Sequence, residues 1–576
     1  MLKTRNFILV ILAVVFLSSI VFAAPQQQVD LLRVGVHNDE NTLTPYTYVT
    51  GSPGLEMVYL VYDALFQLDK DNIPQPWLVE DYELSPDSLV YTFKLAEGVK
   101  WHDGADFTAD DVKFTYDYLV AYPKSRFTNP VKRIQKIEVV DKLTVRMTLA
   151  VPDPNFLIQP IADLPILPKH LWESVDKPNE ADIRIGTGPY ILEDYKSDQY
   201  YKFAANPDYF KGTPVAKILI FPIIKDNTAL FTALKSSDLD AVTRQLTPEL
   251  VTEFERMDKI ALSKGAGYST TLLQLNHEKH PFNIKGFREA LFMAVDRNDI
   301  VNIVLLGQAV LGSPGFIHPD SPFYNPAVAK AGNKNKAVEI LDQLGFKDVT
   351  GNGFREDADG KELKLTMLVY ANNPIRIRAA ELLTESFKGV GLDITVKAMD
   401  INTVDSLVWP DFDVTKGRDF DMTMWGWSAT MQLFPSRLVE LFHSDLSKAN
   451  VNIGAFGNEE FDRLADELRV TMDDAARKDL INKMQAIVAN EFPIIPLYYE
   501  NIVNAYDKTV FSGWEFRSGT GIINKLSFIS EASAQPPDTT PPAPKDDSGS
   551  GLMLWLFLAA AAVAGGFFFL KRGKQS

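Results

Sequence analysis

Acid–base or metal chemistry in this 576-residue chain would have to be built from seven scattered histidines and 75 acidic residues, because cysteine is absent. His277 and His280 form the sequence H-E-K-H, one residue short of the H-E-x-x-H spacing that holds zinc on a helix. Histidines at i, i+3 can share a helix face, but Pro281 and Phe282 follow and indicate a loop. We therefore predict no zinc site here, and spacing singles out no acidic pair.

The segment from Asp348 to Asp359 partly fits a calcium-binding loop. Asp348, Thr350 and Asn352 occupy positions 1, 3 and 5 of such a loop, and Gly353 occupies the sharp turn at position 6. Position 12 is Asp359, where calcium loops place a bidentate glutamate. The alternative is a pair of Asx/Gly turns that joins a helix to a strand. Calcium at this loop is the one cofactor that the sequence suggests.

Motifs for nucleotide hydrolysis and nucleophilic catalysis are missing. The sequence contains no G-x-x-x-x-G-K-[ST] phosphate loop and no G-x-S-x-G nucleophile elbow. The absence of cysteine also excludes disulfides, thiolate metal sites and cysteine nucleophiles. We predict that the chain is not an enzyme; the rival interpretation, a surface hydrolase, lacks a recognisable nucleophile or metal motif.

The charge balance is strongly acidic. The whole chain has a formal net charge of −17. Five of its 58 basic residues and none of its 75 acidic ones lie in the terminal segments described below, which leaves 53 − 75 = −22 for the rest. Such a balance argues against nucleic acid as a binding partner, because its phosphates require a basic protein surface. It favours solubility and a mild attraction of cationic solutes.

The N-terminus has the layout of a secretory signal peptide. Lys3 and Arg5 precede an apolar run over residues 7–22, and the small residue Ala23 provides a cleavage site. We predict a signal peptide at 1–23. An uncleaved signal anchor is the alternative, but the run is short of the roughly 20 apolar residues that a span needs.

The C-terminus has the features of a membrane anchor. Residues 552–570 carry no charge and would form a helix of about 28 Å, close to the thickness of a bilayer core. The basic tail 571–576 follows and should stay cytoplasmic, which places the body outside. A buried core helix is disfavoured because residues 531–551 form a Pro-, Ser- and Thr-rich stalk that separates this segment from any domain. A cleaved lipid-anchor signal would normally end without basic residues.

Between these ends the hydrophobic patterns predict mixed α/β structure. Thr108 and Asp111 form a capping box that begins a helix, and Gly345 ends another over 335–344. Residues 363–370, 375–388 and 392–398 read as a parallel strand–helix–strand unit. Further expected elements are strands at 31–36, 90–95, 137–140, 144–149 and 421–427, and helices at 112–120, 287–306 (split near Asp296), 461–468 and 475–489. Alternating units of this kind give α/β lobes with ligand crevices at strand ends.

Several segments resemble the family 5 extracellular solute-binding proteins, the oligopeptide, dipeptide and nickel receptors of ABC importers. The longest match lies between Val58 and Tyr118 and includes W-H-D-G at 101–104 and T-A-D-D-V at 108–112. Other matches are GTGPYIL at 186–192, LQLNHEKHPF at 273–282, FREALFMAVDRNDIV at 287–301, GFKDVTGNGFREDADGKEL at 345–363 and FPIIPLYYENIVNAY at 492–506. Their order and spacing hold over roughly residues 31–530.

The resemblance implies a two-lobed periplasmic-binding-protein-like fold of the type II, three-domain kind. The implied body, residues 30–530, contains domain I (30–70, 184–276 and 493–530), a small domain II (71–183) and domain III (277–492). Two crossing strands would hinge the lobes, and a small solute would bind between them. The implied function is the extracytoplasmic binding component of an ABC importer, at the cell surface or in the periplasm, with permease and ATPase subunits as partners.

The ligand class depends on one segment. Peptide-binding members supply an amine-pairing aspartate from a W-x-x-D segment, and here Trp427, Ser428 and Ala429 lead to Thr430 in its place. A hydroxyl forms a neutral bond of roughly 0.5–1.5 kcal/mol, against about 1.5–3 for a charge-assisted bond. The amine anchor is therefore lost or has moved to another carboxylate. Peptide is the leading prediction; an oligosaccharide receptor and a ligand sensor that acts through a membrane partner are the alternatives.

The candidate ligand-binding residues follow from these positions. Trp425 and Trp427 alternate on a strand and share one face, which either lines the ligand site or belongs to the core. The resemblance adds three residues after the first strand, Tyr268 in the first lobe, and Tyr499 where the chain crosses back to that lobe. The full set is Tyr46, Val49, Thr50, Tyr268, Trp425, Trp427, Ser428, Thr430 and Tyr499.

Overall fold

The structure is a computed structural model that describes residues 28–429, 432 and 434–530. The predicted signal peptide, Thr430, the stalk, the predicted membrane helix and the basic tail lie outside these residues. Within the described part of the chain, no helix is long and apolar enough to cross a membrane.

A sheet of eleven strands joins two lobes, in the order β15-β14-β16-β12-β17-β11-β1-β10-β9-β8, with β13 paired to β17. In the first lobe, β1 (Val29–Gly35) lies parallel to β10 (Ala216–Pro222) and to β11 (Ala241–Val242). Two antiparallel strands, β9 (Tyr200–Ala205) and β8 (Tyr190–Lys196), complete its edge. The strand predicted at 31–36 is thereby confirmed.

The second lobe contains the predicted strand–helix–strand unit. Strand β14 (Lys364–Tyr370), helix α11 (Pro374–Lys388) and strand β15 (Asp393–Met399) follow one another, and the two strands are parallel. Strand β16 (Met422–Trp427) extends the sheet parallel to β14. Apolar side chains alternate along these strands, so a separate core cluster packs on each face of the sheet.

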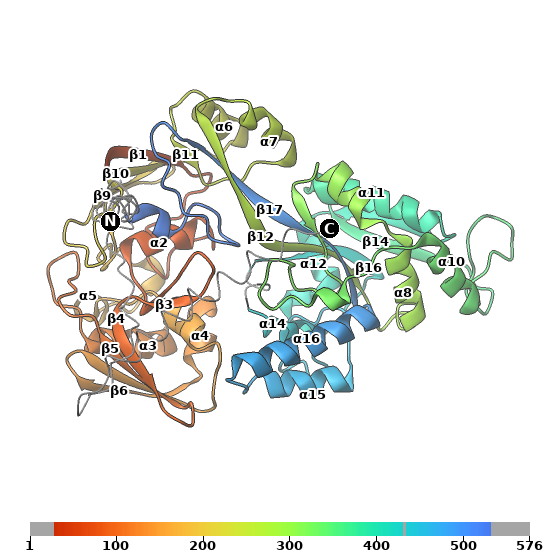
Figure 1. The fold of residues 1–576 in the computed structure, drawn as a ribbon, viewed down its shortest axis with the longest axis horizontal. Helices are drawn as coiled ribbons and strands as arrows, with labels where there is room; N and C mark the ends of the chain where they lie inside the picture. The colour runs from red at the N-terminus through yellow and green to blue at the C-terminus, as the bar shows by residue number, and fades with distance from the viewer. Residues whose placement is uncertain (1–27, 430–431, 433, 531–576) are drawn as a thin grey trace, which may run out of the picture. The chain divides into compact units, whose positions relative to one another are not determined.

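Helices cover both faces of the part of the sheet that lies in the second lobe (Figure 1). One face carries α8 (Lys285–Ala294), α10 (Lys334–Gln343) and α11. The other carries α12 (Ile401–Val408), α14 (Arg437–Phe442), α15 (Glu459–Leu468) and α16 (Asp474–Glu491). The helix predicted over 287–306 is split as expected, because Asp296 caps a new turn that begins α9 (Arg297–Asp299).

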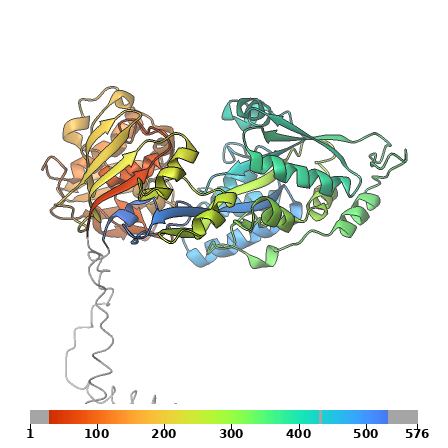
Figure 2. The ribbon, with the colours of Figure 1, turned by 90° about the horizontal axis from the view of Figure 1, so that it is seen from above.

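Two long antiparallel strands connect the lobes. Strand β12 (Ile260–Leu275) and strand β17 (Ile494–Asp507) pair along most of their length. In the first lobe the C-terminal end of β17 pairs with β11. In the second lobe the C-terminal part of β12 pairs with β16. Figure 2 shows β17 as a continuous blue strand that runs from one lobe into the other. This arrangement confirms the two crossing strands, whereas the exact domain boundaries stay predictions.

A four-stranded antiparallel sheet belongs to the first lobe. Its order is β4 (Val79–Leu84), β5 (Val90–Leu95), β7 (Thr144–Leu149) and β6 (Ile134–Asp141), which includes the predicted hairpin. Helix α3 (Ala109–Ala121) packs against it and begins at the predicted capping box of Thr108 and Asp111. The remaining elements of this lobe are α2 (Gly54–Val61), β2 (Phe66–Leu68), β3 (Pro74–Pro76), α4 (Ser125–Val131), α5 (Lys169–Trp172), α6 (Asn227–Lys235) and α7 (Pro248–Glu255).

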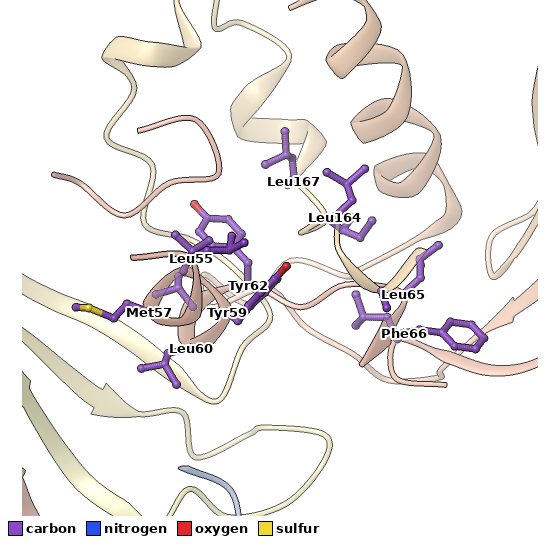
Figure 3. Close-up of a cluster of buried hydrophobic side chains, with 14 of the residues drawn as sticks. Leu55, Met57, Tyr59, Leu60, Tyr62, Leu65, Phe66, Leu164 and Leu167 are labelled. Atoms are coloured by element: carbon purple, nitrogen blue, oxygen red, sulfur yellow. The ribbon is translucent and has the colours of Figure 1, made fainter. Parts of the chain in front are cut away.

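One continuous core joins the small sheet to the main sheet of the first lobe. Figure 3 shows part of it: Leu55, Met57 and Leu60 of α2 lie to one side of Tyr59 and Tyr62, and Leu65 and Phe66 lie to the other. The G-T-G segment lies against α2 so closely that a Cβ on Gly186 would stand 1.9 Å from the carbonyl oxygen of Val61. These glycines therefore serve the fold, as their turn-forming sequence indicates.

A buried ion pair ties the C-terminal segment to this core. Lys525 and Asp63 pair with side-chain exposures of 1% and 0%. Asp63 also accepts hydrogen bonds from Thr187 Oγ1 at 2.8 Å and Trp77 Nε1 at 2.9 Å, and Lys525 Nζ donates to the carbonyl oxygen of Tyr62 at 2.9 Å. Each charge is thus fully partnered, which is the condition under which buried charges are tolerated.

We expect Lys525→Met to lower the free energy of unfolding by about 3–5 kcal/mol, because it leaves the Asp63 carboxylate buried without its counter-charge. The matched control is Lys177→Met, since Lys177 pairs with Glu180 on the surface at 74% and 71% exposure. Such surface pairs contribute about 0–1 kcal/mol. Denaturant titration of both variants measures the difference, and equal effects would contradict the assignment.

Candidate ligand-binding site

The carboxyl ends of the parallel strands in both lobes point toward the crossing of β12 and β17. In the second lobe, Trp427 ends β16 and pairs with Thr270, where β12 enters that lobe. In the first lobe, β1 and β11 run the same way, and the residues that follow them are Val36-His37 and Thr243-Arg244. Ligands of open α/β sheets bind outside the carboxyl ends of strands, so this junction is the candidate site.

Aromatic rings line the end of the second-lobe sheet. Trp425 and Trp427 are 5% and 9% exposed, and their ring centroids lie 6.1 Å apart, which confirms that they share a face. Tyr370 packs on Trp425 at 5.9 Å, and Trp409 packs on Trp427 at 6.1 Å. Their rings form part of the core, but the indole N–H groups of Trp409, Trp425 and Trp427 are buried without a hydrogen-bond partner in the described residues.

Tyr268 and Tyr499 hold a buried histidine between them at the crossing. The ring of His318 lies 4.6 Å from that of Tyr268 and 4.7 Å from that of Tyr499. Tyr499 donates its hydroxyl proton to the carbonyl oxygen of Phe316 at 2.6 Å. The two tyrosines predicted from distant positions are thus brought together, with Tyr499 fully buried and Tyr268 7% exposed.

His318 is a site residue that the sequence did not predict. Burial lowers its pKa to about 4, so the ring is neutral at physiological pH. Its Nδ1 accepts a hydrogen bond from the backbone N–H of Asp320 at 3.0 Å, which places the ring proton on Nε2. That Nε2–H is buried and has no partner among the described residues. The ring is therefore a neutral donor, suited to a carbonyl or hydroxyl oxygen.

Gln432 was also missed, and it fixes the backbone around His318. Its side-chain oxygen accepts from the His318 backbone N–H at 2.9 Å, while its Nε2 donates to the carbonyl oxygen of Phe316 at 2.8 Å and to Thr270 Oγ1 at 3.0 Å. These partners come from two stretches of chain that lie far from Gln432 in the sequence, so no local pattern marks them. Ser428 follows β16 directly, and its neighbour Thr430 lies outside the described residues.

The candidates after the first strand have structural contacts. Tyr46 is 3% exposed, packs on Trp172 at 5.7 Å and donates its hydroxyl to the carbonyl oxygen of Tyr122 at 2.8 Å. The buried carboxylate of Glu40 accepts from the backbone N–H of Val49 at 3.1 Å and from Thr50 Oγ1 at 2.7 Å. The Val49 side chain is 59% exposed. Of these three side chains, that of Val49 has the most free surface for a ligand.

The acidic loop after α10 is organised by turns. Asp348 accepts hydrogen bonds from the backbone N–H groups of Gly351 and Gly353 at 2.6 and 2.9 Å, and Asn352 Oδ1 accepts from that of Phe354 at 2.7 Å. Thr350 Oγ1 donates to Glu356 at 2.8 Å, and the Asp359 backbone N–H donates to Asp357 at 3.0 Å. The Asx/Gly turns of the sequence analysis are present, and calcium binding stays a prediction.

His277 and His280 lie in a loop, as predicted. His277 is bonded through Nε2 to the carbonyl oxygen of Pro493 at 2.9 Å, whereas the His280 side chain is half exposed. Across the described residues, no group of three or more His, Cys, Asp or Glu side chains is arranged to hold a metal ion.

The strand pairing is interrupted at the crossing itself. Ala266 pairs with Asn501, but the next pair is Thr270 with Tyr499, so β12 has extra residues that bulge out. Tyr268 in this bulge adopts a left-handed conformation with φ of 62°. A Cβ on Gly267 would lie 2.3 Å from the carbonyl oxygen of Glu500, which explains the glycine.

Comparison with known proteins agrees with this architecture. The model of the bacterial extracellular solute-binding proteins, family 5, matches residues 74–448. The chain belongs to this family. It is 28% identical over 491 residues to the oligopeptide-binding protein AppA of Bacillus subtilis, covering 83% of this chain and 87% of AppA.

Two further relatives show the range of the family. The heme-binding protein A of Haemophilus influenzae is 27% identical over 464 residues, covering 76% of this chain and 81% of that protein. The structure of the ABC transporter substrate-binding protein CtaP of Listeria monocytogenes is similar with a TM-score of 0.76 and 26% identity, covering 87% of this chain and 99% of CtaP. The two-lobed binding-protein fold is shared with CtaP.

We expect Gly267→Ala in this solute-binding protein to reduce stability by about 1–3 kcal/mol, because the added methyl group must push the crossing strands apart. Gly51→Ala is the control, since a Cβ at Gly51 meets no atom within 4 Å. Thermal unfolding of both variants measures the effect. A normal melting temperature for Gly267→Ala would show that the crossing is less tightly packed than described.

Proposed function

We propose that this family 5 protein captures a peptide between its two lobes outside the cytoplasm and delivers it to the permease and ATPase subunits of an ABC importer. The observation that carries the proposal is the junction of the lobes, where the carboxyl ends of strands from both lobes meet and the buried N–H donors of His318, Trp425 and Trp427 have no partner among the described residues. Unpartnered buried donors are costly, so a ligand that supplies oxygen atoms would complete them.

A peptide fits this set of donors. His318 Nε2–H and the indole N–H groups of Trp425 and Trp427 are neutral, and peptide carbonyl oxygens are neutral acceptors. Apolar peptide side chains would pack on the aromatic rings that surround these groups. The similarity to the oligopeptide-binding protein AppA supports the same ligand class.

An oligosaccharide is the second candidate, and the cluster of Trp409, Trp425 and Trp427 favours it. Sugar rings pack on aromatic faces, and hydroxyl groups accept from indole N–H donors. A ligand sensor that signals through a membrane partner would use the same site.

The terminal segments complete the proposal. A signal peptide at 1–23 would export the chain, and the apolar segment 552–570 would anchor it in the membrane with the stalk 531–551 between body and bilayer. The binding body would then stay beside the permease. The acidic balance of the exported part is compatible with a freely exposed, soluble body.

We expect a peptide mixture to stabilise the purified full chain in a thermal-shift assay, because a ligand that binds the folded state at 100 times its Kd adds about 2.7 kcal/mol. Trp427→Ala should abolish the shift, whereas Trp514→Ala, which alters a tryptophan packed beside Phe511 and Phe528, should keep it. Stabilisation by oligosaccharides alone would replace the peptide proposal with the sugar alternative.

A variant that ends at residue 551 tests the anchor. We expect the full chain to sediment with membranes and the shortened chain to appear in the soluble extracytoplasmic fraction, because residues 552–570 would supply the span. Immunoblots of fractionated cells measure this. Equal membrane association of both chains would contradict anchoring by this segment.

A further inference from the structure

The first and last residues that the structure describes meet at one place in the first lobe. The backbone N–H of Val29 donates to the carbonyl oxygen of Val215 at 2.8 Å, and that of Val215 donates to the carbonyl oxygen of Phe528 at 3.1 Å. The backbone N–H of Ser530 donates to the carbonyl oxygen of Thr213 at 3.2 Å. We call this place, formed by residues 28–29, 213–215 and 528–530, the exit pole, because the predicted stalk begins at the next residue, 531.

The exit pole lies at the end of the first-lobe strands that is opposite the candidate ligand site. Strands β1 and β10 are parallel, and Val29 pairs with Ala216 at their amino ends. The candidate site lies beyond the carboxyl end of β1, where His37 follows the strand. A strand as long as β1, Val29–Gly35, spans about 23 Å. A tether that leaves from the exit pole therefore starts about one strand length away from the ligand site.

The segment that leads to the exit pole is fixed in the core of the first lobe. Phe528 is 1% exposed, and its ring centroid lies 5.7 Å from that of Trp514 and 6.3 Å from that of Phe221 of β10. Just before it in the chain, Lys525 forms the buried ion pair with Asp63 described above. A pull on the stalk would therefore act on the core of the first lobe and not directly on the second lobe.

The second lobe lies on the other side of the crossing strands. In the order of the sheet, β14, β15 and β16 are separated from β1 and β10 by β12, β17 and β11. Figure 1 shows α10 at the end of the second lobe that points away from β1. The turn after α10 contains Val349, whose side chain is 67% exposed. Val349 therefore marks a surface of the body that is far from the exit pole.

We infer that the exit pole is the surface of the body that faces the lipid bilayer, held there by the stalk, while the ligand site and the second lobe point away from the tether. The inference rests on the membrane anchor of the proposed function. A flexible chain as long as the stalk would span about 25 Å, and a fully extended one about 70 Å. In both cases the stalk directly limits the distance between the bilayer and the exit pole. A first lobe held in this way leaves the second lobe free to close on a ligand.

Fluorescence energy transfer to the membrane tests this orientation. The chain contains no cysteine, so Asp30→Cys beside the exit pole and Val349→Cys in the second lobe each provide a single labelling site. Each full-length variant is placed in lipid vesicles that contain an acceptor lipid, and it is labelled from outside with the same membrane-impermeant donor dye. We expect the transfer from position 30 to be at least about twofold more efficient than that from position 349, because the stalk holds only the exit pole near the bilayer.

Three controls exclude misfolding and direct lipid binding as causes of the difference. The side chain of Asp30 is 86% exposed and its ion pair with Lys217 lies on the surface, so Asp30→Cys should melt at the temperature of the unmodified protein. Lys217→Cys labels the same pole from β10 and should reproduce the transfer from position 30. The labels at positions 30 and 349 should give no transfer in a chain that ends at residue 551, because that chain lacks the predicted span.

The outcomes separate this inference from the proposed function. Equal transfer from positions 30 and 349, or stronger transfer from position 349, overturns the orientation and leaves the anchor intact. Transfer from position 349 in the chain that ends at residue 551 would show that the second lobe binds lipid by itself, which also overturns the orientation. Failure of the full chain to remain with the vesicles overturns both the anchor and this inference. Peptide capture is tested separately by the thermal shift and depends on none of these results.

Discussion

The pairing of β12 with β17 is the interaction on which the rest of the structure depends. Each strand belongs to both lobes, so the backbone hydrogen bonds of one antiparallel ladder join the two halves of the eleven-stranded sheet. The direction of this ladder also brings the carboxyl ends of β16 and of β11 to the same place. The bulge between Ala266 and Thr270 interrupts the ladder at its middle, where a small change in backbone angles would turn one lobe against the other.

Buried polar groups hold the scaffold together in several places. In the scaffold, Asp63, Glu40 and Gln432 use their oxygen atoms to accept protein N–H or O–H groups. At the junction of the lobes, His318 Nε2 and Trp427 Nε1 are buried without a partner among the described residues. Unpartnered buried groups such as Trp101 Nε1 and Trp172 Nε1 also occur elsewhere in the described residues, so it is their place at the carboxyl ends of the strands that assigns His318 and Trp427 to the candidate site.

Local elements were predictable from the sequence because their signals are local. The capping box at Thr108, the left-handed Gly345 after α10 and the unit from β14 to β15 lie where the patterns indicate. Neither crossing strand was read from its own pattern, because β12 is interrupted by Gly265 and Gly267 and neither strand keeps a clean alternation. The two strands came from the family resemblance instead.

The site was only partly predictable, since its residues meet through tertiary structure. Tyr268 and Tyr499 are 231 positions apart, and a buried histidine from a third segment joins them. Alternation correctly placed Trp425 and Trp427 on one face, but it could not say that their rings are buried while their N–H groups stay unpaired.

These features bear on how the lobes would close around a ligand. Direct contacts between the lobes away from the crossing include Asn155 with Ser436 at 2.9 Å and Arg378 with Glu249 at 2.9 Å. The second pair is half exposed and contributes at most about 1 kcal/mol. Contacts this weak hold a closed form poorly. A ligand that pairs with both lobes would therefore supply most of the free energy of closure, so that closure reports an occupied site.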